Sequence, residues 1–115
     1  LNILANYGGR WDIADTAKRL AAEVLRGRLS LNSIDEYLFD HHHKLADQPS
    51  VDLLIRTGGE HRISNFLLWQ SAYAELIFTD ILWPDFDGEA LDTCLQEYAG
   101  RERRFGRTSE QVRII

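Results

Sequence analysis

A short apolar run that ends in an arginine, two glycines and a cluster of polar side chains constrains the fold of this chain most. The run Val51–Ile55 leads into Arg56, and the chain continues with Thr-Gly-Gly-Glu-His-Arg-Ile-Ser. Five residues of this character, followed at once by glycines, predict a buried strand and a sharp loop. The segment 66–73 that follows predicts a helix. We therefore expect a strand, a flexible cationic loop and a helix, in that order.

This order predicts an anion-binding loop. Open α/β sheets bind ligands at the carboxyl ends of their strands, and unpaired N–H groups at a helix amino terminus favour phosphate. Two guanidiniums, an imidazole and a hydroxyl lie within nine residues, at Arg56, His61, Arg62 and Ser64. A planar guanidinium matches phosphate oxygens in a bidentate way. The alternative is an ordinary turn in which the two arginines form surface ion pairs and Ser64 caps the next helix.

The rest of the pattern predicts an α/β fold with a mainly parallel sheet and flanking helices. We expect strands over 1–5 and 75–82 in addition to 51–55. Helices are expected from a cap at Asp12 to a stop at Gly27, from Ser33 onward, over 66–73, and after a cap at Asp87. The order β-α-α-β-α-β-α is typical of such sheets. Three strands make a thin sheet, so we expect further structure to protect its edge.

Composition excludes several classes of function. The chain has 115 residues and a net charge of −5, which argues against nucleic acid as a partner. No apolar run approaches the roughly 20 residues needed to span a bilayer, and no signal peptide is visible. Cys94 is the single cysteine, which excludes an internal disulfide. A phosphorylated substrate remains compatible, because it requires only local positive charge, here around Arg56 and again within residues 101–107.

Four segments also resemble known signatures, of which the first two belong to one signature. The strings IRTGGEHRISNFLLWQSAYAEL and TDILWPDF, at 55–76 and 79–86, are similar to the carboxyl-terminal signature of bacterial undecaprenyl diphosphate synthases, which are cis-prenyltransferases. NYGGRWDI at 6–13 resembles an earlier signature of that family. RERRFG at 101–106 is similar to its terminal Arg-x-Gly element. The three matches occur in the family's order.

The resemblance implies that residues 1–115 are the carboxyl-terminal part of a single cis-prenyltransferase domain. The family's Asp-Gly-Asn loop, which binds the allylic diphosphate and Mg²⁺, and its Ser-x-x-Asn segment do not occur in this sequence. The implied reaction condenses isopentenyl diphosphate with farnesyl diphosphate to make undecaprenyl diphosphate, the lipid carrier precursor for cell-wall polysaccharide. The alternative is a non-catalytic diphosphate-binding module or the partner subunit of a two-component prenyltransferase.

The resemblance also assigns roles to residues. Arg56, Arg62, Ile63 and Ser64 match the positions that bind the isopentenyl diphosphate head group. His61 and Glu75 match candidate Mg²⁺ positions, although chemistry alone ranks His61 first as a phosphate donor and leaves Glu75 free to pair with an arginine. No catalytic residue is expected in this chain. The triplet at 41–43 is interpreted as a solvated loop, because three adjacent histidines point in different directions.

The tail and the partners follow from the same resemblance. Arg104 and Gly106 match the element that reaches across a homodimer to the partner's diphosphate site, and the alternative is a solvated helix end. The expected partners are isopentenyl diphosphate, an allylic diphosphate and a second copy of the chain. We expect a cytoplasmic enzyme with peripheral membrane contact through its lipid product, and no activity from this chain alone.

Overall fold

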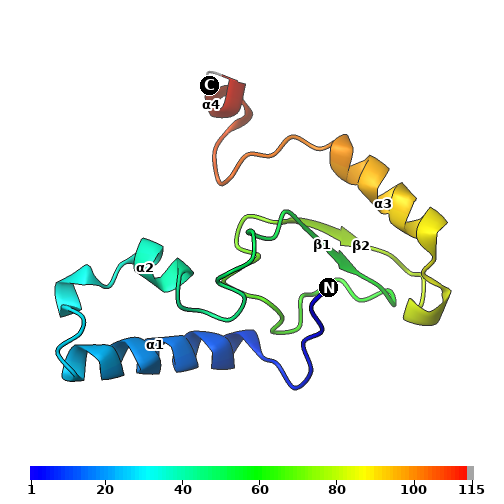
Figure 1. Cartoon of the computed structure of the whole chain (residues 1–115). Coiled ribbons are helices and arrows are strands. Elements are labelled where there is room, and N and C mark those ends of the chain that lie inside the picture. Colours follow the sequence, from blue (N-terminus) through cyan, green and yellow to red (C-terminus); the bar gives the residue numbers. More distant parts are fainter. Residues whose placement is uncertain (114–115) are drawn as a thin grey trace. The chain divides into compact units, whose positions relative to one another are not determined.

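The computed structural model describes residues 1–113, which form two compact units. The first unit contains residues 1–50 and 65–69, and the second contains 51–64 and the chain from Gln70 onward. Figure 1 labels the α-helices and the strands, and the structure contains two 3₁₀ helices, η1 and η2, in addition. In chain order they are α1 (Gly9–Leu25), η1 (Leu31–Ser33), α2 (Glu36–Asp40), β1 (Leu53–Arg56), β2 (Glu75–Phe78), η2 (Trp83–Asp85), α3 (Gly88–Ala99) and α4 (Ser109–Arg113).

The first unit is built on α1, whose amino terminus is capped from a distant part of the sequence. The N-cap residue Gly8 has no side chain to accept a hydrogen bond. Asn65 accepts instead, through its backbone oxygen from the Gly9 N–H at 2.6 Å and through its side-chain oxygen from the Arg10 N–H at 2.8 Å. Two of the orphan donors of the helix are thereby satisfied. Gly27, at φ +72°, follows the C-cap Arg26, which confirms the predicted helix stop.

The predicted cap at Asp12 is wrong. Asp12 lies in the first turn of α1 and is only 1% exposed. Its carboxylate accepts hydrogen bonds from the Tyr7 hydroxyl at 2.8 Å and from the Lys44 N–H at 2.9 Å. The residue therefore ties the segments on either side of α1 to the helix. Burial of the carboxylate is tolerated because several donors reach it.

The predicted helix over 66–73 is also wrong, since these residues form turns. Ser64, Asn65 and Leu67 have φ values of +49°, +63° and +46°. Positive φ is incompatible with right-handed helix and is unusual for side-chain-bearing residues. Capping of α1 requires Asn65 to present both oxygens outward, and a helix beginning there would withdraw its backbone oxygen into intrahelical bonding.

Two other expectations for the first unit are corrected. No strand forms over residues 1–5, where Leu1 and Ile3 are exposed, because a strand requires a neighbour and none pairs with this segment in the described chain. The helix predicted from Ser33 is replaced by two elements, η1, which ends at Ser33, and α2, which begins only at Glu36. The second of these begins after Asp35, whose side chain accepts a hydrogen bond from the Leu38 N–H at 2.8 Å.

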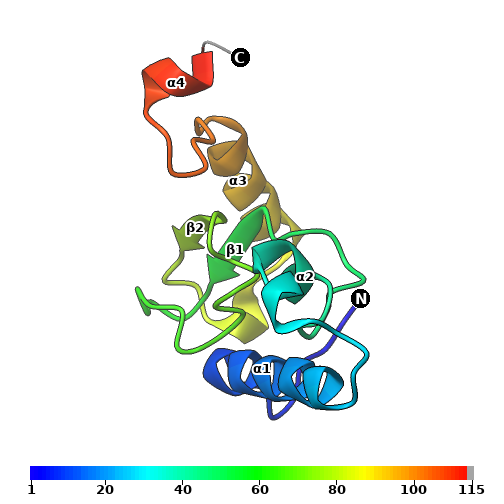
Figure 2. The same cartoon turned by 90° about the vertical axis from the view of Figure 1, so that its left-hand side faces the viewer.

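The second unit contains a parallel pair of strands, which Figure 2 shows side by side. The register pairs Leu53 with Glu75 at one end and Arg56 with Phe78 at the other. The third predicted strand, 75–82, ends early because residues 79–81 bond to the glycine loop after β1. The Gly59 N–H donates to Thr79 O and the Gly58 N–H donates to Ile81 O, both at 2.9 Å.

Helix α3 confirms the last of the predicted elements. Asp87 caps it by accepting a hydrogen bond from the Ala90 N–H at 2.9 Å. Leu54, Ile77 and Cys94 are the buried apolar residues of this unit in the described chain. Helices with a parallel sheet confirm the α/β class. Within residues 1–113, no helix has the length and apolar character required to cross a membrane.

Candidate diphosphate site

The cationic loop begins where β1 ends, as the sequence predicts. Arg56 is the last residue of β1, and its backbone oxygen accepts a hydrogen bond from the Thr79 N–H at 2.9 Å. Gly58 and Gly59 follow with φ values of +85° and +78°. Glycine adopts two consecutive left-handed conformations without steric cost, and these let the loop lie along residues 79–81. The backbone around the arginine is therefore fixed on both sides.

The Arg56 side chain is half-buried and makes no ion pair or side-chain hydrogen bond with any part of the chain that the structure describes. Its five donors are thus available to a ligand. This disagrees with the surface ion pair that the sequence left open for this arginine. No nitrogen of this guanidinium is both buried and unsatisfied, so the group remains accessible to an anionic ligand, with which it can form charge-assisted hydrogen bonds.

Arg62 and His61 are placed differently. Arg62 forms an ion pair with Glu60 at 3.1 Å, and 74% of its side chain is exposed. An exposed pair of this kind contributes little, so a doubly charged ligand can displace the carboxylate. The His61 ring packs against Phe78, with ring centroids 5.1 Å apart. Since Phe78 pairs with Arg56 in the register, His61 and Arg56 lie at the same end of the sheet.

The other two candidate residues, Ile63 and Ser64, come next after Arg62 in the loop. Ile63 is half-buried, whereas Ser64 is exposed and has a positive φ. No helix begins at Ser64, so the alternative in which Ser64 caps a following helix does not hold, and the helix dipole expected beside this loop is absent from the described chain. Any anion bound here depends on side chains and on loop N–H groups other than those of Gly58 and Gly59, which donate to Ile81 O and Thr79 O.

Glu75 lies at the opposite end of the sheet from His61. It is the first residue of β2, three residues before Phe78, which corresponds to about 10 Å along a parallel strand. The Glu75 carboxylate accepts a hydrogen bond from Arg101 at 3.3 Å, and Arg101 also reaches Leu76 O at 2.8 Å and Glu97 at 2.6 Å. Hydrogen bonding to Glu97, followed by that to Glu75, raises the pKa of Arg101. A single chain therefore does not bring the two candidate metal positions together.

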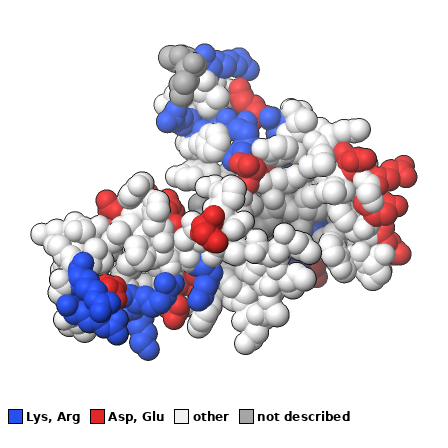
Figure 3. Space-filling view, in the orientation of Figure 1, with Lys and Arg blue, Asp and Glu red and all other residues white. Residues whose placement is uncertain are grey.

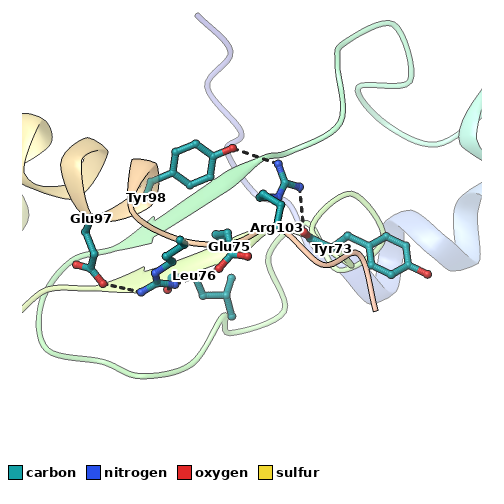
Figure 4. A network of polar contacts seen from close by, with 7 residues as sticks. Tyr73, Glu75, Leu76, Glu97, Tyr98 and Arg103 are labelled. Atoms are coloured by element: carbon teal, nitrogen blue, oxygen red, sulfur yellow. Dashed lines mark hydrogen bonds and ion pairs between the residues drawn. The ribbon is translucent and has the colours of Figure 1, made fainter. Parts of the chain in front are cut away.

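The carboxyl-terminal segment that begins at Arg101, here called the tail, lies near Glu75 rather than near Arg56. Arg103 donates to Asp52, just before β1, at 2.8 Å. It also donates to Tyr73 O, just before β2, at 3.1 Å (Figure 4). Arg104 pairs with Glu102 at 3.1 Å, and Gly106 has φ +76°. The contacts of Arg101 and Arg103 were not expected from the sequence. The four arginines within residues 101–107 were the available signal, but they do not specify which acceptors the side chains reach.

Charge is distributed unevenly over this unit. Figure 3 shows acidic side chains grouped over α3 and the segment before it, and basic side chains at α4 and the loop that leads to it. The tail is therefore cationic although the net charge of the whole chain is −5. Local positive charge of this kind suits an anionic ligand.

Fold and site together define an α/β protein with a cationic glycine loop at the carboxyl edge of a parallel sheet. The family described as putative undecaprenyl diphosphate synthase matches residues 1–106. The chain belongs to this family of prenyltransferases, which confirms the resemblance and the fold that it implies.

Curated relatives agree with this assignment. The chain is 58% identical over 108 residues to the ditrans,polycis-undecaprenyl-diphosphate synthase, (2E,6E)-farnesyl-diphosphate specific, of Escherichia coli K12, covering 94% of this chain and 43% of that protein. It is 60% identical over 114 residues to an isoprenyl transferase of Neisseria meningitidis, covering 99% and 44%. The chain thus spans less than half the length of these relatives.

A solved structure supports the fold independently. The crystal structure of lavandulyl diphosphate synthase from Lavandula x intermedia, in complex with dimethylallyl diphosphate, aligns with a TM-score of 0.82 at 46% identity. The alignment covers 88% of this chain and 44% of that one. The assignment of individual site residues stays a prediction, as does the interpretation of residues 1–115 as part of a single domain.

Proposed function

We propose that this chain is the isopentenyl diphosphate-binding part of a cis-prenyltransferase that extends farnesyl diphosphate to undecaprenyl diphosphate, the lipid carrier precursor for cell-wall polysaccharide. The observation that carries the proposal is Arg56, whose backbone is fixed at the end of β1 and whose guanidinium has no acceptor in the described chain. The farnesyl-specific synthases at 55% and 58% identity supply the substrate class.

The reaction assigns simple tasks to the residues of this chain. The allylic substrate loses diphosphate, a carbon–carbon bond forms to the alkene of isopentenyl diphosphate, and a proton leaves. Arg56 and Arg62 donate to the head group of isopentenyl diphosphate, and the Ser64 hydroxyl donates a further hydrogen bond. Ile63 lines the same site. Holding the second substrate in a reactive orientation is largely an entropic contribution.

The candidate metal positions of this chain, His61 and Glu75, would supply only part of a magnesium site. No group of three or more His, Cys, Asp or Glu side chains within residues 1–113 could hold a metal ion. Mg²⁺ needs only one or two protein ligands when water and phosphate oxygens complete its octahedron. Glu75 retains a carboxylate oxygen that Arg101 does not contact, so Glu75 would hold the ion, with His61 as the second candidate. When bound, the ion neutralises charge on the departing diphosphate.

We further propose a cytoplasmic homodimer with peripheral membrane contact through its lipid product. The tail and Glu75 lie at the opposite end of the sheet from Arg56, which supports a role for Arg104 and Gly106 at the partner's site. Retention of Arg56, Arg62, Ser64 and Glu75 favours a catalytic protein over a non-catalytic partner subunit.

The test uses a chimaera in which this chain replaces the matching segment of the Escherichia coli synthase. We expect it to convert farnesyl and isopentenyl diphosphates into long-chain product. Arg56→Lys keeps the charge but removes the planar fork, and Arg56→Gln removes both. Loss of one charge-assisted hydrogen bond predicts a fall of roughly 10- to 150-fold in kcat/KM for isopentenyl diphosphate, equivalent to roughly 1.5–3 kcal/mol.

A matched control is Arg26→Gln, which removes an exposed arginine paired with Glu23 at 3.0 Å on α1. We expect this variant to retain the kinetics of the chimaera. A folded chimaera without product would contradict the proposed function. Unchanged kinetics in both Arg56 variants would instead show that Arg56 does not bind the substrate.

A further inference from the structure

Residues 101–104 form an extended segment with two chemically different faces. Arg101 and Arg103 are half-buried. Arg101 donates to the backbone of β2 at Leu76 O, and Arg103 donates to Asp52, which precedes β1. Glu102 and Arg104 are exposed and pair with each other at 3.1 Å. This alternation is that of an extended chain, in which successive side chains point in opposite directions. One face holds the tail in place and the other presents Arg104.

Arg103 is the inner-face residue with contacts to several segments, and Figure 4 shows it between Tyr98 and Tyr73. Its Nη1 atom donates to Asp52 Oδ1 at 2.8 Å and to the Tyr98 hydroxyl oxygen at 3.1 Å. Its Nη2 atom donates to Tyr73 O at 3.1 Å. One guanidinium thus joins the tail to α3 and to the residues that precede both strands. The hydrogen bond to Asp52 is the main reason that the pKa of Arg103 is raised.

The same guanidinium supports an unfavourable turn. Phe105 and Gly106 have φ values of +50° and +76°, and the turn is closed by the Arg107 N–H, which donates to Arg104 O at 2.9 Å. Glycine adopts this conformation freely, whereas phenylalanine does so only when its surroundings enforce it. The Arg103 guanidinium lies 4.4 Å from the centroid of the Phe105 ring, which is a cation–π contact.

We propose that Arg103 is the positioning residue of the Arg104-Phe105-Gly106 element. It fixes the start of the tail against the sheet and holds Phe105 in its left-handed conformation, so that Arg104 is presented on the outer face in one orientation. The part of this proposal that concerns substrate rests on the proposed function. The part that concerns the conformation of the tail does not.

Hydrogen exchange tests the conformational part in the chimaera. The reporter is the peptide that contains the Arg107 amide, with α1 as the internal reference. Arg103→Gln should accelerate exchange in residues 104–108 by about tenfold, the order expected when charge-assisted hydrogen bonds are lost. Asp52→Asn removes one partner and should have a smaller effect in the same direction. Arg26→Gln should leave this peptide unchanged.

Kinetics test the functional part. If Arg103 acts through Arg104, Arg103→Gln should raise KM for isopentenyl diphosphate, and the double variant Arg103→Gln with Arg104→Ala should lose no more than Arg104→Ala alone. Arg103→Lys should recover only part of the loss, because lysine cannot bridge three acceptors in the same plane.

The two measurements separate the possible failures. Unchanged exchange in residues 104–108 of a folded Arg103→Gln chimaera would overturn the proposal. Suppose that Arg103→Gln accelerates exchange, but that its kinetic loss adds to the loss of Arg104→Ala in the double variant. This result would overturn the claim that Arg103 acts through Arg104. If the chimaera makes no product, the proposed function fails, and the exchange experiment still decides whether Arg103 anchors the tail.

Discussion

Gly9 begins α1 at a point where there is no room for a methyl group. A Cβ atom at this position would lie 2.6 Å from Leu68 Cγ, 3.0 Å from the Leu68 backbone nitrogen and 3.1 Å from Asn65 O. The leucine side chain can rotate away, but the two backbone atoms belong to the turn that caps the helix. We therefore expect Gly9→Ala to separate α1 from its cap and to destabilise the fold.

The magnitude follows from two terms. Overpacking of a buried site costs about 1–3 kcal/mol, and distortion of the 2.6 Å hydrogen bond from Gly9 to Asn65 removes about 0.5–1.5 kcal/mol. The expected loss is about 2–4 kcal/mol in the free energy of unfolding. With a urea m-value of about 2 kcal/mol/M, the unfolding midpoint of the chimaera should fall by roughly 1–2 M.

Two other glycines provide matched controls for this urea titration. Gly88, the first residue of α3, has open space around the position that a Cβ atom would occupy, with no atom within 4 Å, so Gly88→Ala should be neutral or slightly stabilising. At Gly8 the closest atom is the Asn65 side-chain nitrogen at 2.9 Å, which can move, so Gly8→Ala should be intermediate. Equal midpoints for Gly9→Ala and Gly88→Ala would refute the steric argument.

Two further predictions concern the metal and the dimer. Glu75→Gln in the chimaera should raise the Mg²⁺ concentration for half-maximal activity at least severalfold, because the amide lacks the charge that a hard cation requires, and an unmoved titration would make Glu75 structural. Mixing Arg104→Ala subunits with Arg56→Ala subunits should recover activity above either parent, since one site of the mixed dimer is intact if the tail acts in trans. No recovery after confirmed subunit exchange would place the tail at the site of its own chain.

Local signals in the sequence were sufficient for several elements. Asp87 is followed by an amphipathic helix, and the structure contains α3 with Asp87 as its cap. Gly27 was expected to end the first helix, and it adopts the left-handed conformation that a helix end requires. The strand before Arg56 was found within two residues of its predicted limits. In each case the residues that determine the element are neighbours in the sequence.

The features that could not be predicted from the sequence depend on hydrogen-bond partners that lie far away along the chain. The segment after Ser64 has helical composition, but Asn65 accepts hydrogen bonds from Gly9 and Arg10, 55 residues away in the second case. The sequence indicates that Glu75 can pair with an arginine, yet the identity of that partner, Arg101, depends on how α3 returns to β2. Tertiary context overrides local propensity at both positions.

The candidate site divides in the same way. The position of Arg56 at a strand end followed from the apolar run and the two glycines. The separation of His61 from Glu75 did not, because it depends on the register that pairs Arg56 with Phe78 and Leu53 with Glu75. Register is a property of the strand pair, and neither strand specifies it alone.

The sheet itself leads to the last prediction. Parallel sheets are normally buried on both faces, and two strands are too few for independent stability. Within the described residues, β1 and β2 pair only with each other. Several large apolar side chains of the second unit are also substantially exposed, among them Leu82 at 60%, Trp83 at 74% and Leu95 at 45%. These features require additional packing partners.

We therefore expect the 115-residue chain alone to bind a hydrophobic dye, to show weak near-ultraviolet circular dichroism and to form no long-chain product from farnesyl and isopentenyl diphosphates with Mg²⁺. The chimaera, in which the host supplies further structure, should lack the first two properties and form product. Sustained turnover by the isolated chain would contradict this expectation, because it would show that two strands and the residues around Arg56 suffice for both binding and chemistry. Dye binding without turnover would show that the isolated chain lacks packing partners as well as substrate contacts.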